Sequence, residues 1–86
     1  MIAFRDVNPK AETHVLVVPE RHLDSLSEIG EFGAEESKKM LDFIAETAHT
    51  LGLKDYRVIT NVGHGGGQTV FHLHWHILAG NLPVFG

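Results

Sequence analysis

The 86-residue sequence contains no cysteine, which excludes disulfide bonds, thiolate nucleophiles and zinc sites built on cysteine. Basic residues are few as well: 7 Lys and Arg stand against 11 Asp and Glu, and they form no cluster. We therefore expect neither nucleic acid nor an anionic membrane surface as a partner. No apolar run approaches the roughly 18 residues of a membrane span, and no secretory leader is recognisable. A cytoplasmic protein is expected.

The length of the chain and its apolar content predict one globular domain over residues 1–86. Hydrophobic residues make up 43% of the sequence, which is typical of a folded domain and argues against disorder. A chain this short hides only about 60–65% of its unfolded surface on folding. A second subunit would add buried area, and we expect a homodimer.

The distribution of β-branched residues, apolar periodicity and turn residues predicts an α+β fold. One convincing helix is expected at about residues 34–51, ended by Gly52. The segment 23–29 is expected to be a loop with a helical turn. Strands are expected at residues 2–5, 13–18, 56–62 and 68–79. The glycine-rich connection 63–67 predicts an antiparallel hairpin, so the fold is an antiparallel sheet with one main helix on one face.

Three histidines alternate with large apolar residues in the last predicted strand. Because alternate side chains of a strand point to opposite faces, His72, His74 and His76 should share one face. The opposite face should pack under the helix and carries Phe71, Leu73, Trp75 and Ile77. Imidazole changes its protonation near neutral pH, so a row of three indicates chemistry more than packing.

Three interpretations of this row compete. The histidines could line the exposed face of a half-buried sheet without a chemical role. They could bind a metal, although His72 and His76 would lie about 13 Å apart along a strand while zinc needs nitrogens about 2.0–2.1 Å from one point. Two neighbours sharing a metal with His14 or His64 would meet that requirement better.

The third interpretation is covalent catalysis at phosphorus. A neutral imidazole nitrogen is a nucleophile at pH 7, provided that its other ring nitrogen is held by a hydrogen bond. The phosphate oxygens also need donors. The segment 65–69, Gly-Gly-Gly-Gln-Thr, offers backbone N–H groups, an amide and a hydroxyl directly before the first histidine.

The run His72-Leu-His-Trp-His76-Ile-Leu resembles the signature of the histidine triad (HIT) superfamily of nucleotide hydrolases and transferases, most closely its HINT-like branch. Further similar segments follow in order along almost the whole chain, at residues 3–9, 11–19, 51–53, 56–57, 61 and 66–71. Relatives have an additional segment before the one that resembles Ile2-Ala3-Phe4, so the resemblance is to a HIT-like fold that is N-terminally shortened.

The resemblance implies a role for each histidine of the site. His74 would attack the α-phosphorus and form a nucleotidyl-histidine that water then hydrolyses. His76 would contact the phosphate, His72 would support the hydrogen-bond network, and His14 resembles an additional active-site histidine. The transferase branch has Gln where this chain has His76, so His76 favours hydrolysis.

The resemblance also implies a set of substrate contacts. The phosphate or leaving group would meet Asn61, Gly67, Gln68 and Thr69. Asp6 would hold the ribose hydroxyls, with Phe4 and Val7 near the base.

The function implied in this way is hydrolysis at the α-phosphorus of a purine nucleoside phosphoramidate or a related nucleotidyl conjugate, without a metal or another cofactor. One alternative is a fragment that binds nucleotide without turnover. Another is a zinc-binding module that uses two triad histidines and His14. The sequence assigns no role to His22, His49 or His64.

Overall fold

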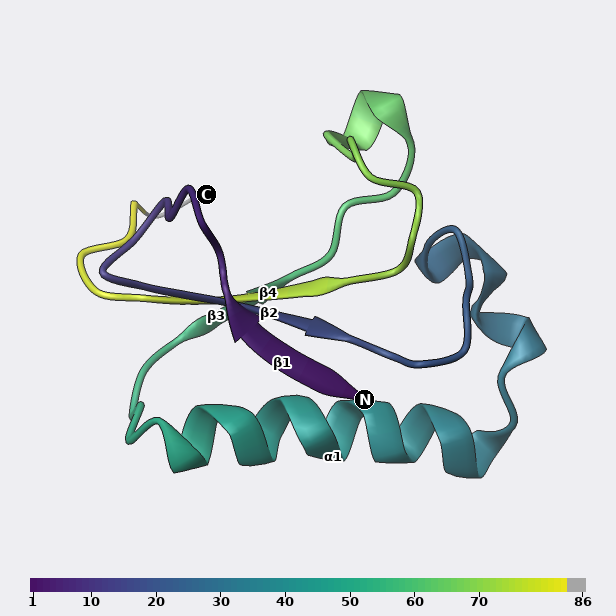
Figure 1. Ribbon diagram of the computed structural model, residues 1–86, viewed down its shortest axis with the longest axis horizontal. Coiled ribbons are helices and arrows are strands. Elements are labelled where there is room, and N and C mark those ends of the chain that lie inside the picture. The colour runs from purple at the N-terminus through teal and green to yellow at the C-terminus, as the bar shows by residue number, and fades with distance from the viewer. Residues whose placement is uncertain (84–86) are drawn as a thin grey trace.

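The computed structural model describes residues 1–83 and shows one four-stranded sheet with a long helix beneath it (Figure 1). The α+β class and the single main helix are confirmed. The strands are β1 (Ile2–Arg5), β2 (Thr13–Val18), β3 (Arg57–Ile59) and β4 (Trp75–Ala79), and the helix is α1 (Ala34–Thr50). Two short 3-10 helices, η1 (Leu26–Glu31) and η2 (His64–Gly66), lie in the connections. No helix within residues 1–83 is long and apolar enough to cross a membrane.

The sheet is antiparallel throughout, with strand order β1-β2-β4-β3. Strand β4 therefore lies in the interior of the sheet and pairs with a strand on each side. Its residue His76 is in register with Leu16 of β2 and with Ile59 of β3. A residue at this position has its backbone held on both sides, which gives its side chain a fixed direction.

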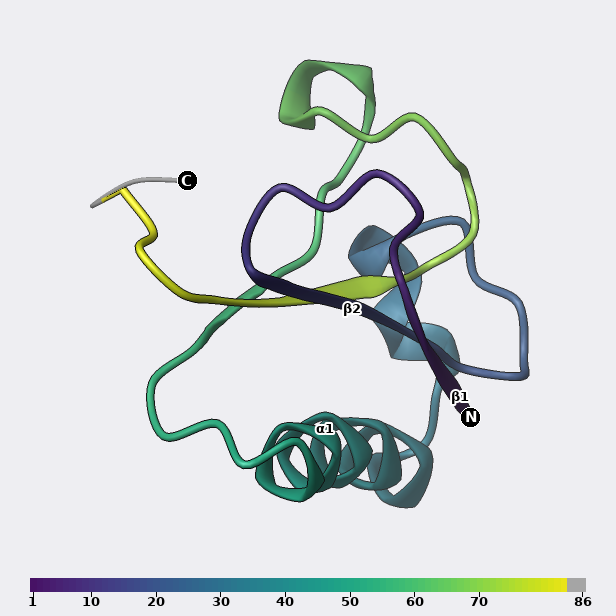
Figure 2. The ribbon, with the colours of Figure 1, turned by 60° about the vertical axis from the view of Figure 1, so that its left-hand side comes forward.

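Helix α1 covers one face of the sheet, and the connection that carries η2 rises from the other (Figures 1 and 2). The helix follows Gly33, has Glu35 and Glu36 in its first turn near the positive end of its dipole, and ends before Gly52, which has a φ of +74°. Its buried residues Met40, Ile44 and Ala48 recur every four positions, as an apolar stripe requires.

Two buried clusters fill the space between α1 and the sheet. The first contains Val15, Val17, Ile44, Ala48 and Ile77, and the second contains Leu23, Phe32, Met40 and Leu73. Trp75 packs against both clusters, and its indole N–H points at the sulfur of Met40 at 3.4 Å. Val15 and Val17 of β2 and Ile77 of β4 point to this face, so the residues that alternate with them, His14 and His76 included, point to the opposite face.

The predicted strands 2–5 and 13–18 match β1 and β2, whereas the predicted strands 56–62 and 68–79 are too long. The chain leaves the sheet at Thr60 and returns at Trp75. In this connection, side chains form hydrogen bonds with backbone groups that would otherwise pair between two strands. Thr60 Oγ1 donates to the carbonyl oxygen of His74 at 2.7 Å, and Gly63 and Gly67 adopt φ values of +72° and +88°. Strands β3 and β4 still pair antiparallel, but the connection is no tight hairpin.

The prediction that Phe71 faces the core is wrong. Its side chain is 41% exposed, and its ring lies against the ring of His64 with 4.9 Å between centroids. The alternation argument fails here because Phe71 lies outside β4, where the period of two no longer applies. For Leu73, Trp75 and Ile77 the expected direction is confirmed.

Candidate active site

Three histidine rings meet on the face of the sheet away from α1. His76 comes from β4, His14 from the paired strand β2, and His74 from the residue just before β4. The ring of His76 lies 5.1 Å, centroid to centroid, from each of the other two rings. His72 stands apart from this group and packs against His22 instead. The predicted row is therefore a group of three, in which His14 is the third ring.

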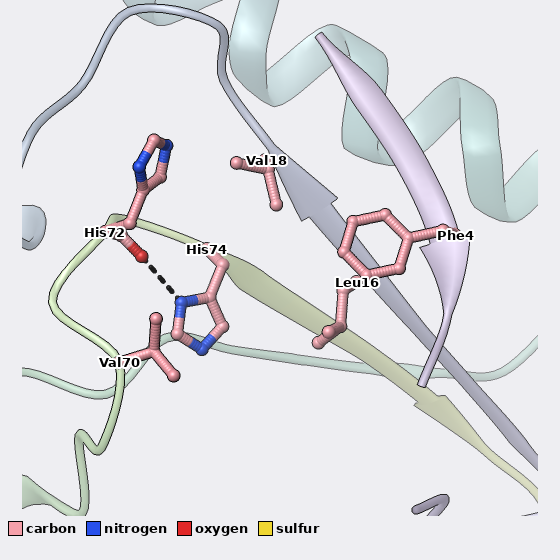
Figure 3. A pocket seen from close by; sticks show the side chains of 6 residues that line it. All are labelled: Phe4, Leu16, Val18, Val70, His72 and His74. Atoms are coloured by element: carbon pink, nitrogen blue, oxygen red, sulfur yellow. Dashed lines mark hydrogen bonds between the residues drawn. The ribbon is translucent and has the colours of Figure 1, made fainter. Parts of the chain in front are cut away.

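The orientation of the His74 ring is fixed by a hydrogen bond to the backbone two residues earlier. Its Nδ1 lies 2.7 Å from the carbonyl oxygen of His72 (Figure 3). A carbonyl oxygen can only accept, so Nδ1 carries the proton. In the neutral ring, Nε2 then has a free lone pair, which is the form that a nucleophile needs.

His74 borders an apolar pocket. Its walls are Phe4, Leu16, Val18, Val70, His72 and His74 itself (Figure 3). Phe4 reaches this pocket from β1 and Leu16 from β2, so the predicted base contact Phe4 does lie next to the predicted nucleophile. The predicted contact Val7 is 90% exposed and does not line this pocket.

The pair His14–His76 has its tautomers set by a chain of hydrogen bonds. The backbone N–H of Lys10 donates to Nδ1 of His14 at 3.0 Å, so the proton of His14 is on Nε2. This Nε2 lies 2.8 Å from Nδ1 of His76 and donates to it. The remaining proton of His76 is therefore on Nε2, which makes His76 a hydrogen-bond donor toward any group bound beside it.

The surroundings of His76 disfavour the charged form of its ring. Burial lowers its pKa below the ordinary value, the neighbouring rings of His74 and His14 lower it further, and Asp6 acts in the opposite direction. The Asp6 carboxylate lies 3.6 Å from Nε2 of His14 and accepts the backbone N–H of Asn8 at 2.8 Å. His14 itself is buried, at 5% exposure.

A second, polar pocket adjoins this pair. Residues that line it include Asp6, Lys10, His14, Asn61, Thr69 and His76. The structure thus brings five of the predicted site residues to one pocket: His76, His14, Asp6, Asn61 and Thr69. His74 lines the apolar pocket and His76 lines the polar one, and the centroids of these two rings lie 5.1 Å apart.

The glycine-rich segment was expected to offer its backbone N–H groups to a phosphate, but three of these groups form hydrogen bonds within the loop itself. The backbone N–H of Gly66 donates to Gly63, and those of Gly67 and Gln68 donate to His64 and Gly63, so these donors are used inside the loop. The Gln68 side chain is 2% exposed: its Oε1 accepts from Gly63 N at 2.8 Å, and its Nε2 donates to the carbonyl oxygens of Asp24 and Val70. Gln68 holds the loop together, and the amide is not presented to a substrate.

The same site contains ligand atoms suited to a metal ion. Asp6, His14 and His76 offer one oxygen and two nitrogens that lie within 4.8 Å of one another. Carboxylate oxygen and imidazole nitrogen are ligands that zinc takes. The zinc alternative grouped two triad histidines with His14. In the structure, the possible ligands are one triad histidine, His76, together with His14 and the carboxylate of Asp6.

Sequence reasoning missed His22 and Asp24. Nδ1 of His22 lies 2.9 Å from Nδ1 of His72, and Nε2 of His22 lies 2.8 Å from Oδ1 of Asp24. His22 is fifty positions before His72 and follows the end of β2, where neither spacing nor alternation indicates a contact with the triad.

Comparison with known proteins places these residues in a family. The model of the HIT domain matches residues 1–82. A HIT-like protein of Helicobacter pylori is 42% identical over 82 residues, which are 93% of this chain and 76% of that protein. The purine nucleoside phosphoramidase of Escherichia coli is 34% identical over 80 residues, 91% of this chain and 67% of that enzyme.

Solved structures give the same result. A HIT family hydrolase from Clostridium thermocellum superposes with a TM-score of 0.83 at 42% identity, covering 98% of this chain and 73% of that one. A HIT family hydrolase from Legionella pneumophila superposes with a TM-score of 0.87 at 35% identity, covering 96% of this chain and 76% of that one. The chain belongs to the HIT domain family and is similar to its hydrolases.

Proposed function

We propose that the protein hydrolyses the bond at the α-phosphorus of a purine nucleoside phosphoramidate or a related nucleotidyl conjugate, with Nε2 of His74 as the nucleophile. The observation that carries this proposal is the 2.7 Å bond from His74 Nδ1 to the carbonyl of His72, which puts the lone pair of the neutral ring on Nε2. The substrate class is supported by the Escherichia coli relative, which is named purine nucleoside phosphoramidase.

In the first step, the lone pair of His74 Nε2 attacks phosphorus and a new N–P bond forms. The P–N bond to the leaving amine breaks, and its electron pair stays with the amine, which takes a proton from solvent. His74, now substituted on Nε2, keeps its Nδ1–H bond to the carbonyl of His72 and carries a positive charge. That bond stabilises the charged ring, since a hydrogen bond with one charged partner is stronger than a neutral one.

In the second step, a water molecule attacks the same phosphorus. The P–N bond to His74 breaks, its electron pair returns to Nε2, and a proton of the water passes to solvent. Over the two steps, one water is consumed, and a nucleoside monophosphate and an amine are released. In both steps Nε2–H of His76 donates to a phosphoryl oxygen, where negative charge develops.

The substrate is placed by the two pockets. The base lies against Phe4 in the apolar pocket, and Asp6, two residues further along the chain, accepts the ribose hydroxyls. The phosphate lies between His74 and His76, with the hydroxyl of Thr69 and the amide of Asn61 at the border of the polar pocket.

The test is the intact mass of the protein after brief incubation with adenosine 5′-phosphoramidate and a denaturing quench. We expect an adenylyl adduct on the natural chain and none on the His74→Ala variant. Binding of adenosine monophosphate to both proteins without any adduct or substrate loss would instead support the alternative of a nucleotide-binding protein without turnover.

A further inference from the structure

A second histidine pair lies beside the triad, outside the group around His76. The rings of His22 and His72 meet edge to face, with 4.6 Å between centroids and an interplanar angle of 65°. The contact continues at both ends: Nε2 of His22 meets Oδ1 of Asp24 at 2.8 Å, and Nε2 of His72 meets the carbonyl oxygen of Pro19 at 3.4 Å. The result is a chain of four polar groups, Asp24–His22–His72–Pro19.

The number of protons in this chain follows from the chemistry of its ends. The carboxylate of Asp24 and the carbonyl of Pro19 only accept hydrogen bonds, so both Nε2 atoms carry a proton. The two Nδ1 atoms lie 2.9 Å apart, and a contact this short between nitrogens needs a proton between them. Two rings then hold three protons, one more than two neutral imidazoles have. With three shared protons, the two rings would carry one positive charge opposite the Asp24 carboxylate.

This pair is connected to the nucleophile through a single residue. The backbone carbonyl of His72 accepts the Nδ1–H of His74 at 2.7 Å, while the ring of His72 is held by His22. The same ring also forms a wall of the apolar pocket beside His74 (Figure 3). Fixing the ring of His72 at both nitrogens therefore restrains the residue whose carbonyl sets the tautomer of His74.

We propose that Asp24 and His22 are positioning residues, which hold His72 in a proton-sharing, singly charged pair and thereby orient His74 for attack. This role rests on the function proposed above. The carboxylate of Asp24 stabilises the positive charge of the pair, and His22 connects this carboxylate to the ring of His72 through its two ring nitrogens. Neither residue touches the substrate, so their effect is on the reactivity of His74 and on the charge next to the phosphate.

The experiment compares three variants with the natural chain: Asp24→Asn, which keeps an acceptor but removes the charge, Asp24→Glu, which restores a carboxylate, and His22→Gln. Glu31→Gln is the matched control, because it removes the same charge from the same part of the chain, and no hydrogen bond or ion pair of its side chain to a histidine is seen within residues 1–83. Far-ultraviolet circular dichroism and Trp75 fluorescence confirm that each variant is folded.

The first measurement is NMR of ¹⁵N-labelled imidazoles, which reports the protonation of each ring nitrogen and does not depend on activity. We expect three protons on the His22–His72 pair of the natural chain and of Glu31→Gln, and two in Asp24→Asn. Two neutral rings in the natural chain would overturn the proposal.

The second measurement is the rate of adenylyl transfer to His74. We expect kcat to fall about tenfold or more in Asp24→Asn and His22→Gln, with a smaller change in KM, by analogy with the partners that orient metal-bound histidines, whose loss costs about 10–100-fold. Asp24→Glu should recover most of the loss. An unchanged kcat in His22→Gln would overturn the positioning role. If the natural chain forms no adduct at all, the proposed function fails and the positioning role falls with it, whereas the shared proton is upheld or refuted by NMR alone.

Discussion

Nε2 of His14 donates a hydrogen bond of 2.8 Å to Nδ1 of His76, although the two residues are 62 positions apart in the sequence. Leu16 of β2 is in register with His76 of β4. His14 lies two residues before Leu16 and points to the same face of the sheet, so the rings of His14 and His76 are diagonal neighbours there. The chemical consequence of the hydrogen bond is that the proton of His76 is directed away from His14, toward the polar pocket. A residue that is only 5% exposed thus decides which nitrogen of His76 can donate.

Replacing His14 by Asn should lower kcat about 10–100-fold, by analogy with the partners that fix the tautomer of metal-bound imidazoles. Nucleotide affinity should change much less, because the proposed mechanism assigns the phosphate contact to His76 and not to His14. Steady-state kinetics with adenosine 5′-phosphoramidate and calorimetric binding of adenosine monophosphate separate the two effects. His49→Asn, at the exposed end of α1, is the control and should retain full activity. Equal activity of both variants would contradict the role of the His14–His76 bond.

The lowered pKa of His76 predicts how stability depends on pH. Burial and the rings of His74 and His14 disfavour its charged form in the folded protein. Above the ordinary pKa of histidine, both states are neutral and no penalty exists. As the pH falls below that value, the unfolded chain takes up a proton that folded His76 does not, so the free energy of unfolding decreases.

Urea denaturation at neutral and at mildly acidic pH measures this effect. The natural chain should lose more stability between the two conditions than the His76→Asn variant, because Asn has no proton to gain. The other histidines are common to both proteins and cancel in the difference. An identical loss in the two proteins would show that His76 is protonated as easily when folded as when unfolded.

The sequence predicts the parts of the site that follow from alternation within strands. The side chains of Trp75 and Ile77 face α1 and that of His76 faces away, as a period of two requires. The prediction fails where the chain leaves the sheet. Phe71 is exposed because the connection from Thr60 to His74 is shaped by long-range side-chain bonds, which no local pattern reveals.

Contacts between distant segments are the other part that the sequence cannot supply. Only the resemblance to the HIT superfamily predicts a catalytic role for His14, since a single histidine in an apolar strand is usually a packing residue. His22 was not predicted at all. Both become part of the site through the register of β2 against β4 and the path of the chain after Pro19, which depend on the whole fold.

The bonds of Gln68 predict a structural role for this residue. Replacement by Ala would leave the N–H of Gly63 and the carbonyl of Asp24 without their side-chain partner in a partly buried part of the loop. We expect a loss of about 1 kcal/mol in the free energy of unfolding for each hydrogen bond removed, the usual net contribution of such a bond. Urea denaturation measures it, with Val62→Ala, exposed in the same connection, as the control. If Gln68 met the substrate instead, KM would rise and stability would be unaffected.

The grouping of Asp6, His14 and His76 makes a metal-dependent reaction a specific alternative. The proposed mechanism uses the proton on Nε2 of His76 and the lone pair of His74, and no step needs a metal. Activity should therefore be unchanged after exhaustive chelation, with metal content checked by plasma mass spectrometry. Loss of activity that added zinc restores would refute the mechanism and favour the zinc alternative.

Asp6 is expected to recognise the ribose, and its charge makes this testable. Replacement by Asn should raise KM for adenosine 5′-phosphoramidate about tenfold, since a hydrogen bond to a charged acceptor contributes about 1.5–3 kcal/mol. Asp6 also lies 3.6 Å from Nε2 of His14, so a rise in KM alone could come from a disturbed His14–His76 pair. The 2′,3′-dideoxy substrate separates a lost ribose contact from a disturbed His14–His76 pair, because it lacks the hydroxyls from which Asp6 would accept hydrogen bonds. With this substrate the variant and the natural chain should have the same KM. A tenfold difference that persists without the hydroxyls would show that Asp6 acts through His14 and not through the ribose.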